Sequence, residues 1–312
     1  MPNNHPRICV AGSTNIDLTF RAARLPRPGE TLAGTDFHLG FGGKGANQAV
    51  MAARLGAAVA MIAKVGNDVF GRQMTASLKA EGIDTSWVLV DEGRPSGTAA
   101  IIVDDNAQNC IIVVPGANDA LTPDDVRAAA AVIQHADVLV CQLEVPLETS
   151  LEAFRLARAA GVRTILNPAP AKHLPEELLK LTDLLVPNET ELESILPAAG
   201  GPVRDLDSAR QAAGRIGVPR LIVTLGSEGA ILVDGASAEH VPARKVTAVD
   251  PTGAGDAFIG SLSVFWAQGC TLREAAQRAS AVAALSVTRP GAQTAFPTLA
   301  EVSAFLGPVY WP

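Results

Sequence analysis

Short runs rich in Val, Ile and Leu alternate with longer alanine-rich segments along most of this chain, and this alternation constrains its fold more than any other feature. The short runs are apolar on both faces, which is typical of parallel strands covered by helices on either side. The expected strands are Arg7–Ala11, Val59–Val65, Asp137–Gln142, Arg163–Asn167, Leu184–Pro187 and Arg220–Leu225. The segments with helical periodicity are Lys44–Leu55, Pro123–His135, Glu148–Ala160 and Asp207–Ile216. This pattern predicts an α/β fold with a doubly wound, mostly parallel central sheet flanked by helices.

A second kind of segment interrupts this pattern. It consists of runs that alternate as half-exposed strands do, namely Ile16–Phe20, Thr31–Leu39, Thr98–Val103 and Cys110–Val114. The last two are separated by a polar stretch that is typical of a hairpin connection. We therefore expect a small β-sheet lid, with strands within about 16–40 and 97–115, inserted into a single domain that spans 1–312.

Composition excludes several classes of protein. The net charge of -7 argues against nucleic-acid binding, which favours a basic face. The apolar stretches are too short to span a membrane, and the polar first residues do not form a signal peptide. The four cysteines are dispersed without a Cys-x-x-Cys pair, and the five histidines form no pair at helical spacing, so neither disulfides nor a structural zinc is expected. The sequence predicts a cytoplasmic protein without nucleic-acid or membrane partners.

The stretch 249–258 is the most informative about chemistry. A turn that contains Gly253 and Gly255 leads directly into an apolar helical pattern, so the N–H groups of the first helical turn would attract an anion. Asp256 lies among them, and an acidic residue there can also serve only to cap the helix. The functional alternative is phosphoryl transfer, in which the N–H groups stabilise negative charge and the carboxylate takes a proton from an attacking hydroxyl.

Two better-known phosphate-binding loops are excluded. Lys44 is followed by Gly45 rather than by Ser or Thr, so a Walker-type loop would lack its magnesium-binding hydroxyl. A dinucleotide-binding loop needs a third glycine, and Gln48 or Phe258 occupies that position in the two glycine-rich stretches.

Polar residues and glycines follow several of the expected strands. Ligands of open α/β sheets bind beyond the carboxyl ends of the strands, so these clusters are expected to meet. Each also has an ordinary structural explanation, as a turn former, tight connection, helix cap or hairpin turn. The clusters are Asn15 with Asp17, Gly42 to Asn47, Glu144, Asn188 with Glu191, and Thr224 to Gly229.

Two glycine-rich signatures and four shorter stretches together resemble a known family. The signatures are Gly40–Ala49 and Asp250–Phe258, and the shorter stretches are Pro115–Asn118, Gln142–Glu144, Asn167–Ala171 and Pro187–Glu191. On these residues the chain resembles the ribokinase family of carbohydrate kinases over nearly its whole length, from Gly12 to Gln293. The resemblance implies ATP-dependent phosphorylation of a sugar, in the first place D-ribose to D-ribose 5-phosphate.

The resemblance also implies site residues. Asp256 would be the general base, and Gly253, Ala254 and Gly255 would form the anion hole. The sugar-binding residues would be Asn15, Asp17, Gly43, Lys44, Asn47 and Glu144, with Ala99 and Ile111 as apolar cover from the lid. The nucleotide-binding residues would be Asn188, Thr224, Gly226, Ser227, Gly229, Gly255 and Ser280.

Two cations and a second subunit are further implications of the resemblance. Glu191 would help to hold Mg²⁺, through water. A K⁺ site would be formed by Asp250, Thr252, Ser286, Arg289, Gly291 and Ala295. The exposed edges of the lid strands favour a homodimer that pairs two lids.

Alternatives remain open on the sequence alone. A sibling kinase could act on fructose, deoxyribose, a sugar acid or a nucleoside with the same fold and base. A protein of another class, a non-catalytic sugar-binding protein, could also use the fold, although the intact Asp256, Gly253 and Gly255 favour an enzyme. Ala99 and Ile111 leave less room than glycines would, which favours a compact pentose.

Overall fold

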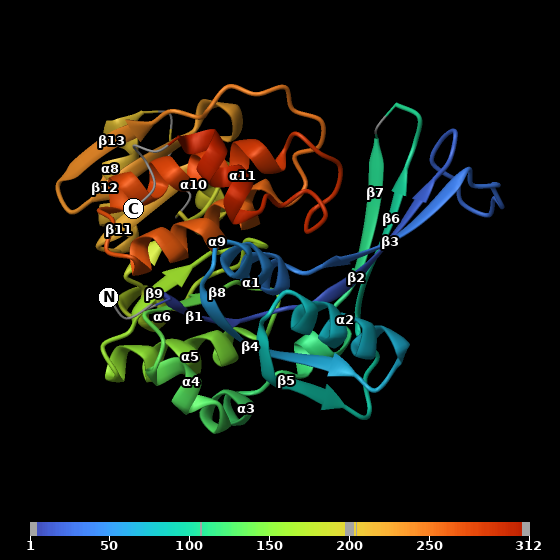
Figure 1. Cartoon of the computed structure of the whole chain (residues 1–312), viewed down its shortest axis with the longest axis horizontal. Coiled ribbons are helices and arrows are strands. Elements are labelled where there is room, and N and C mark those ends of the chain that lie inside the picture. The colour runs from blue at the N-terminus through green and yellow to red at the C-terminus, as the bar shows by residue number, and fades with distance from the viewer. Residues whose placement is uncertain (1–4, 107, 197–202, 204, 308–312) are drawn as a thin grey trace.

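A nine-stranded sheet forms the centre of the protein in the computed structural model, which describes residues 5–106, 108–196, 203 and 205–307 (Figure 1). Seven strands are parallel, in the order β11–β10–β9–β8–β1–β4–β5, and β12 and β13 add an antiparallel edge. This confirms the predicted mostly parallel sheet. The strands are β1 (Arg7–Ala11), β4 (Ala58–Gly66), β5 (Asp84–Asp91), β8 (Val138–Cys141), β9 (Arg163–Leu166), β10 (Leu184–Leu185), β11 (Arg220–Thr224), β12 (Ala230–Asp234) and β13 (Ser237–Val241).

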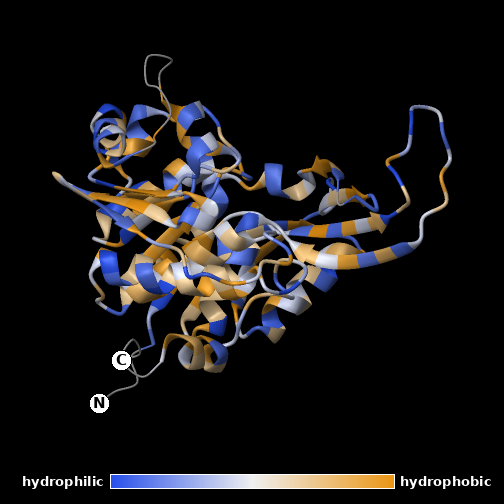
Figure 2. Ribbon diagram, turned by 90° about the horizontal axis from the view of Figure 1, so that it is seen from above, coloured by the Kyte–Doolittle hydropathy of each residue, from blue (hydrophilic) through white to orange (hydrophobic). Residues whose placement is uncertain are grey.

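Helices cover both faces of the sheet and make two apolar layers. Alternate residues of β1 illustrate this, since Ile8 and Val10 join one layer while Cys9 and Ala11 join the other. The first layer contains residues of α1 (Lys44–Arg54), α9 (Ala254–Ala267), α10 (Leu272–Ser286) and α11 (Leu299–Leu306). The second contains residues of α3 (Pro123–Ala128), α4 (Ala130–Gln134), α5 (Leu147–Ala159), α6 (Glu176–Lys180), α7 (Glu189–Ile195) and α8 (Leu206–Ile216). The burial of β-strands on both faces explains why their sequences are continuous apolar runs, which are also visible in Figure 2.

The predicted lid is a separate four-stranded sheet in the order β3–β2–β6–β7. Its strands are β2 (Asn15–Arg21), β3 (Asp36–Gly42), β6 (Gly97–Val103) and β7 (Asn109–Val114). The lid extends away from the rest of the molecule (Figure 1). At its base Ile16 is buried with Met74 of α2 (Val69–Ala80), whereas every residue of β7 is exposed.

Three predicted elements differ from the structure by more than one residue at an end. The strand expected at Thr31–Leu39 is β3, which begins and ends later in the chain, at Asp36 and Gly42. The reason is its pairing with β2, in which Asn15 lies opposite Gly42 and Arg21, the last residue of β2, lies opposite Asp36. The helix expected over Pro123–His135 is divided into α3 and α4 at Ala129. The apolar run expected to continue to Pro187 forms only the short β10. No helix in the described part of the chain is long and apolar enough to cross a membrane.

Candidate active site

The glycine turn before α9 presents an open helix start. Gly253 has a φ of 76°, in the left-handed region, and it begins α9 without any side-chain cap. A Cβ added to Gly255 would meet nothing within 4 Å, so this side of the turn faces open space. The N–H of Ala254 donates to the carbonyl of Pro251 at 3.1 Å, which closes the turn.

Asp256 does not cap its own helix. It is the third residue of α9, only 7 % exposed, and its carboxylate points toward α1. Asn47 Nδ2 donates to Oδ2 and Gln48 Nε2 donates to Oδ1, each at 2.9 Å. Burial raises the pKa of Asp256, while the charge of Lys44 and the two amide donors oppose the rise. The ordinary capping explanation for this residue is therefore excluded, and a buried carboxylate with a perturbed pKa is typical of a functional site.

Three carboxylates from distant parts of the chain meet at the carboxyl ends of the strands. The pKa of Asp17 is raised to about 6, first by burial and then by the negative charges of Glu144 and Asp256. Glu144 Oε2 accepts from Ser13 Oγ at 2.5 Å and from the backbone N–H of Lys44 at 2.9 Å. The expectation that the clusters at the strand ends would lie together thus holds for these residues.

The lid contributes one face to this group. In the lid sheet Asp17 on β2 is paired with Ala99 on β6. Ile101 lies two residues beyond Ala99, on the same face of β6, and is paired with Ile111 on β7. Ala99 is 6 % exposed and Ile111 is 51 % exposed. Ile111 therefore lies farther out on the lid than Ala99, on the face that carries Asp17.

Two buried asparagines and a glycine fix the geometry beneath the lid. Asn15 Oδ1 accepts from Asn118 Nδ2 at 2.7 Å. Gly43 has a φ of 87°, and a Cβ there would lie 2.8 Å from the Cα of Thr14. Only glycine allows α1 to begin so close to the β1–β2 connection, which brings Lys44 and Asn47 to the carboxylates.

The predicted nucleotide-binding residues form a second group. Asn188 and Glu191 make a capping box at the start of α7, and Asn188 bridges to Thr224 at the end of β11. Glu191 Oε2 accepts from the N–H of Asn188 at 2.9 Å, and burial raises the pKa of Glu191, an effect that the charge of Lys44 opposes. The charges of Lys44 and Asp256 both act on Glu191, so its carboxylate is electrostatically coupled to the first group.

The remaining nucleotide residues lie on neighbouring elements. Gly226 and Ser227 are exposed in the turn after β11. Gly229 has a φ of 99°, and its absent Cβ would lie 2.1 Å from the carbonyl oxygen of Val241. Ser280 is buried on α10, a helix that contacts β12 and β13.

The residues predicted to hold K⁺ include a loop tied together by Asp250. Its carboxylate accepts from the N–H of Thr252 at 2.9 Å and from the N–H of Gly291 at 2.8 Å. Ser286 and Ala295, which flank Gly291 in the sequence, are buried. The guanidinium of Arg289 forms an ion pair with Glu301. Within the described ranges, no three His, Cys, Asp or Glu side chains are grouped as an all-protein metal site.

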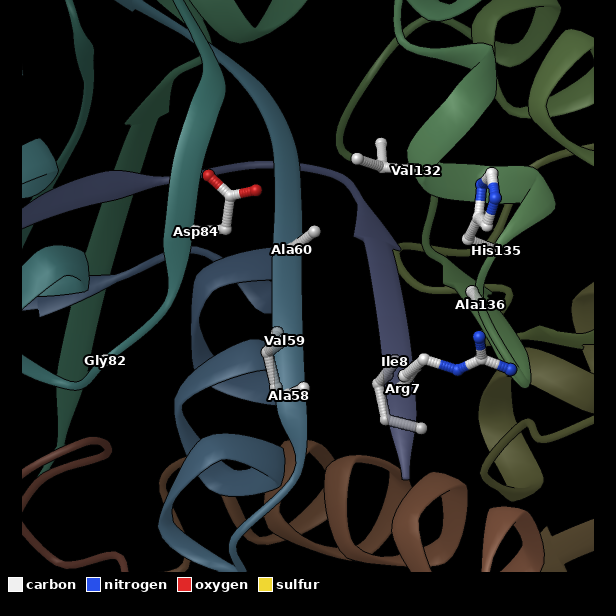
Figure 3. A pocket seen from close by; sticks show the side chains of 10 residues that line it. All are labelled: Arg7, Ile8, Ala58, Val59, Ala60, Gly82, Asp84, Val132, His135 and Ala136. Carbon is white, nitrogen blue, oxygen red and sulfur yellow. The ribbon is translucent and has the colours of Figure 1, made fainter. Parts of the chain in front are cut away.

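A hollow of about 300 Å³ lies at the opposite end of the sheet (Figure 3). Its lining includes Arg7, Ala58 and Asp84, which lie at the starts of β1, β4 and β5, together with His135. It contains none of the predicted site residues, because these follow the carboxyl ends of the strands.

Several polar residues of the site had no predicted role. Ser13 donates to Glu144 and Asn118 donates to Asn15, and a set of buried amides is linked to Asp256 directly or through Asn47 and Gln48. Some of these residues lie within the stretches that carried the family resemblance, and this was the one signal in the sequence that could have identified them as site residues. The buried amides are Gln48, Gln142, Asn167 and Gln293, together with Asn47, which was predicted to bind the sugar.

A doubly wound sheet with a lid beside a glycine turn, one buried carboxylate and two partly buried ones is the architecture of a small-molecule kinase. Comparison with known proteins agrees. The model of the pfkB family carbohydrate kinases matches residues 5–299. The chain therefore belongs to the pfkB family of carbohydrate kinases.

Individual relatives and solved structures show which members of the family this chain is similar to. The chain is 41 % identical to a ribokinase of Mus musculus over 93 % of this chain and 91 % of that protein. It is 40 % identical to a deoxyribokinase of Salmonella typhi over 96 % of this chain and 98 % of that one. The structure of an Arabidopsis thaliana ribokinase complexed with ribose and ATP matches with a TM-score of 0.89 at 30 % identity, covering 97 % and 99 % of the two chains.

Proposed function

We propose that this protein transfers the γ-phosphoryl group of ATP to D-ribose and forms D-ribose 5-phosphate. The observation that carries the proposal is the buried carboxylate of Asp256, held by two amide donors beside Asp17 and Glu144 at the start of an uncapped helix. The similarity to a ribokinase structure with ribose and ATP supports the substrate pair.

In the proposed reaction, Asp256 accepts the proton of the sugar hydroxyl as its oxygen attacks the γ-phosphorus. A new P–O bond forms, and the bond from the γ-phosphorus to the bridging oxygen of ADP breaks. Such general-base assistance contributes roughly 10²–10⁴-fold in rate. The N–H groups of Gly253 and Gly255 stabilise the charge on the phosphoryl oxygens, and the open space beside Gly255 leaves room for them. The N–H of Ala254 is already bonded to Pro251 within the turn.

The residues also fit the two proposed cations. A carboxylate oxygen suits Mg²⁺, which keeps several waters and binds nucleotide phosphates, so Glu191 would hold it through water. When bound, Mg²⁺ spreads charge over the β and γ phosphate oxygens. Asp250 would hold K⁺ with Thr252 and oxygen atoms of Ser286, Arg289, Gly291 and Ala295.

The choice of sugar needs its own test, because the identities to a ribokinase and to a deoxyribokinase are nearly equal, at 41 % and 40 %. A panel of ribose, 2-deoxyribose, fructose, a sugar acid and nucleosides should be assayed with MgATP for ADP release. D-Ribose should have the highest kcat/KM, because buried polar partners discriminate against an analogue that lacks a hydroxyl. A tenfold higher kcat/KM for another member of the panel would contradict the assignment of ribose as the substrate. The assignment to the sugar-kinase family would remain.

Sugar affinity should depend on pH through Asp17. In the free protein its pKa is about 6, and a carboxylate that accepts bonds from sugar hydroxyls is favoured in its charged form. Binding therefore expels a proton below pH 6, and the Kd for sugar should rise toward about tenfold per pH unit there and be flat above pH 7. Calorimetric titration between pH 5 and 8 measures this. In the Asp17→Asn variant the dependence should disappear, and a persistent slope would assign it to another group.

Potassium should activate the enzyme. Asp250 joins the segment before the anion turn to Gly291, so a cation held by this loop would fix the turn that faces the phosphate. Turnover with saturating MgATP should be several times faster in KCl than in NaCl at the same ionic strength. Equal rates in KCl, NaCl and an organic-cation buffer would show that the loop holds no activating cation.

The lid should form a homodimer. β7 is a free edge strand with Ile111, Ile112, Val113 and Val114 at least half exposed. An exposed apolar edge of this kind is typical of a protein interface. Sedimentation equilibrium at micromolar concentration should give the mass of two chains, and Ile112→Lys should lower it to one. The mass of one chain for the unaltered protein would contradict the proposal.

A further inference from the structure

The carboxylate of Asp256 is the end point of two lines of buried amide side chains. In the first, Gln48 Nε2 donates to Asp256 Oδ1 at 2.9 Å and to Asn167 Oδ1 at 3.2 Å, and Gln142 Nε2 donates to Gln48 Oε1 at 2.6 Å. In the second, Gln293 Nε2 donates to Asn47 Oδ1, and Asn47 donates to Asp256. Both oxygens of the carboxylate therefore receive an N–H.

A backbone carbonyl outside the site sets the direction of the first line. A carboxamide has a donor end and an acceptor end, so each bond dictates how the next group turns. Asn167 Nδ2 donates to the carbonyl of Val186 at 3.0 Å, and a carbonyl can only accept. Asn167 must then present its oxygen to Gln48, and Gln48 must present its Nε2. Both hydrogens of that Nε2 are used, one on Asn167 and one on Asp256.

The other end of the line shows that this direction is imposed. Gln142 Oε1 is buried and has no hydrogen-bond partner among the described residues. Turning the Gln142 amide over would place its oxygen against Gln48 Oε1, which is also an acceptor. The unpaired oxygen is thus a consequence of the direction fixed by Val186 and Asn167.

Close packing of two helices brings Gln48 within reach of the base. Gln48 is fully buried on α1, and a Cβ added to Gly260 of α9 would lie 2.5 Å from its backbone oxygen. A glycine at 260 therefore allows α1 and α9 to approach closely at the level of Gln48. Asp256 lies one helical turn before Gly260, on the same side of α9.

We propose that Gln48 is a positioning residue for phosphoryl transfer, which orients the carboxylate of Asp256 and keeps it ionised to receive the sugar proton. The inference rests on the proposed role of Asp256 as the base. A protonated Asp256 would need an acceptor for its O–H, and neither Asn47 nor Gln48 offers one, since both present their NH₂ groups to the carboxylate and turn their oxygens to other amides. The amide bonds also oppose the rise in the pKa of Asp256 that burial causes.

Gln48→Leu tests the proposal, because leucine fills similar space without an N–H. The assay is kcat against pH from 5 to 9.5, with saturating MgATP and D-ribose, or the best sugar of the panel. The kcat profile reports groups in the substrate complex. Its acid limb should shift upward by about one unit, so kcat should fall by up to about tenfold on the acid side of the limb and recover at higher pH. KM for both substrates should change far less.

Gln142→Met is the matched control. It removes an amide from the same buried cluster but leaves Asn167 and Val186, which fix the direction of the Gln48 amide, so the acid limb should stay in place even if thermal stability falls. If Gln48→Leu does not fold, Asn167→Leu takes its place. Asn167 has no contact with Asp256, but its loss leaves the Gln48 amide free to rotate. The acid limb should therefore again move upward.

The outcomes separate this inference from the proposed function. Asp256→Asn is measured in parallel. Suppose that Asp256→Asn is inactive and that Gln48→Leu folds. If the acid limb of Gln48→Leu is unmoved, or if its kcat falls equally at every pH, the positioning role alone is overturned. Near-normal turnover of Asp256→Asn would instead overturn the assignment of the base.

Discussion

Asp256→Asn should lower kcat by about 10² or more while ATP and sugar still bind. The substitution keeps the size of the side chain and removes its basicity. Asp256 is buried and both of its oxygens accept from amides of the protein, so the group that replaces it would have to supply basicity from the same enclosed position. The measurement is turnover at saturating substrates, together with the Kd of each substrate by calorimetry.

The amides around Asp256 make a second variant useful as a control. Asn47 and Gln48 both present donors, so the NH₂ group that Asp256→Asn introduces meets one of them donor to donor. Asp256→Ala removes this conflict as well as the base. If both variants bind ATP and sugar normally and both lose turnover, the loss belongs to the missing base. A folded Asp256→Asn enzyme with nearly normal turnover would show that another group accepts the proton.

Most of the central sheet could be predicted because its strands are buried on both faces. The predicted bounds of β1 agree with the structure, and those of β9 and β11 differ by one residue, since a continuous apolar run has no other stable place in a folded chain. No strand was predicted for β5, or for the hairpin of β12 and β13. These lie at the two edges of the sheet, where β5 and β13 in particular are partly exposed and their sequences are less apolar.

The register of the lid depended on pairing that the sequence does not show. β3 begins at Asp36, five residues later than expected, because its partner β2 ends at Arg21. The alternation of residues from Thr31 onward is compatible with several registers, and only the pairing selects one.

The site was predictable to the extent that strand ends converge. Asp17, Glu144 and Asp256 follow different elements and influence one another electrostatically, as the rule for open α/β sheets implies. The amide line through Gln48 was not predictable, because Gln48 and Asp256 are 208 residues apart and meet through the packing of α1 on α9. In the sequence Gln48 lies within the signature Gly40–Ala49 and stands where a dinucleotide-binding loop would have a glycine, and neither fact indicates a contact with Asp256.

Glu144→Ala should reduce kcat/KM for the sugar by about 10- to 150-fold and leave ATP affinity nearly unchanged. The expected range corresponds to the loss of one hydrogen bond to a charged group, about 1.5–3 kcal/mol. Glu144 also accepts from Ser13 Oγ and from the N–H of Lys44, at the start of α1. Its removal therefore takes away a sugar partner and also loosens the beginning of the helix that carries Asn47. The nucleotide-binding residues Asn188 and Thr224 lie on other elements, so ATP should bind as before.

Glu144→Gln separates these two contributions. The amide keeps an oxygen that can accept from Ser13 and Lys44, so α1 should remain in place, and only the charge presented to the sugar is lost. Its kcat/KM should fall less than that of Glu144→Ala, with an unchanged Kd for ATP in both proteins. If Glu144→Ala weakened ATP binding as much as sugar use, Glu144 would be a scaffold residue of the whole site rather than a sugar partner. The calorimetric Kd for ATP decides between these outcomes, because the carboxylate of Glu144 contacts the start of α1 and has no hydrogen bond to the described elements that carry the nucleotide group.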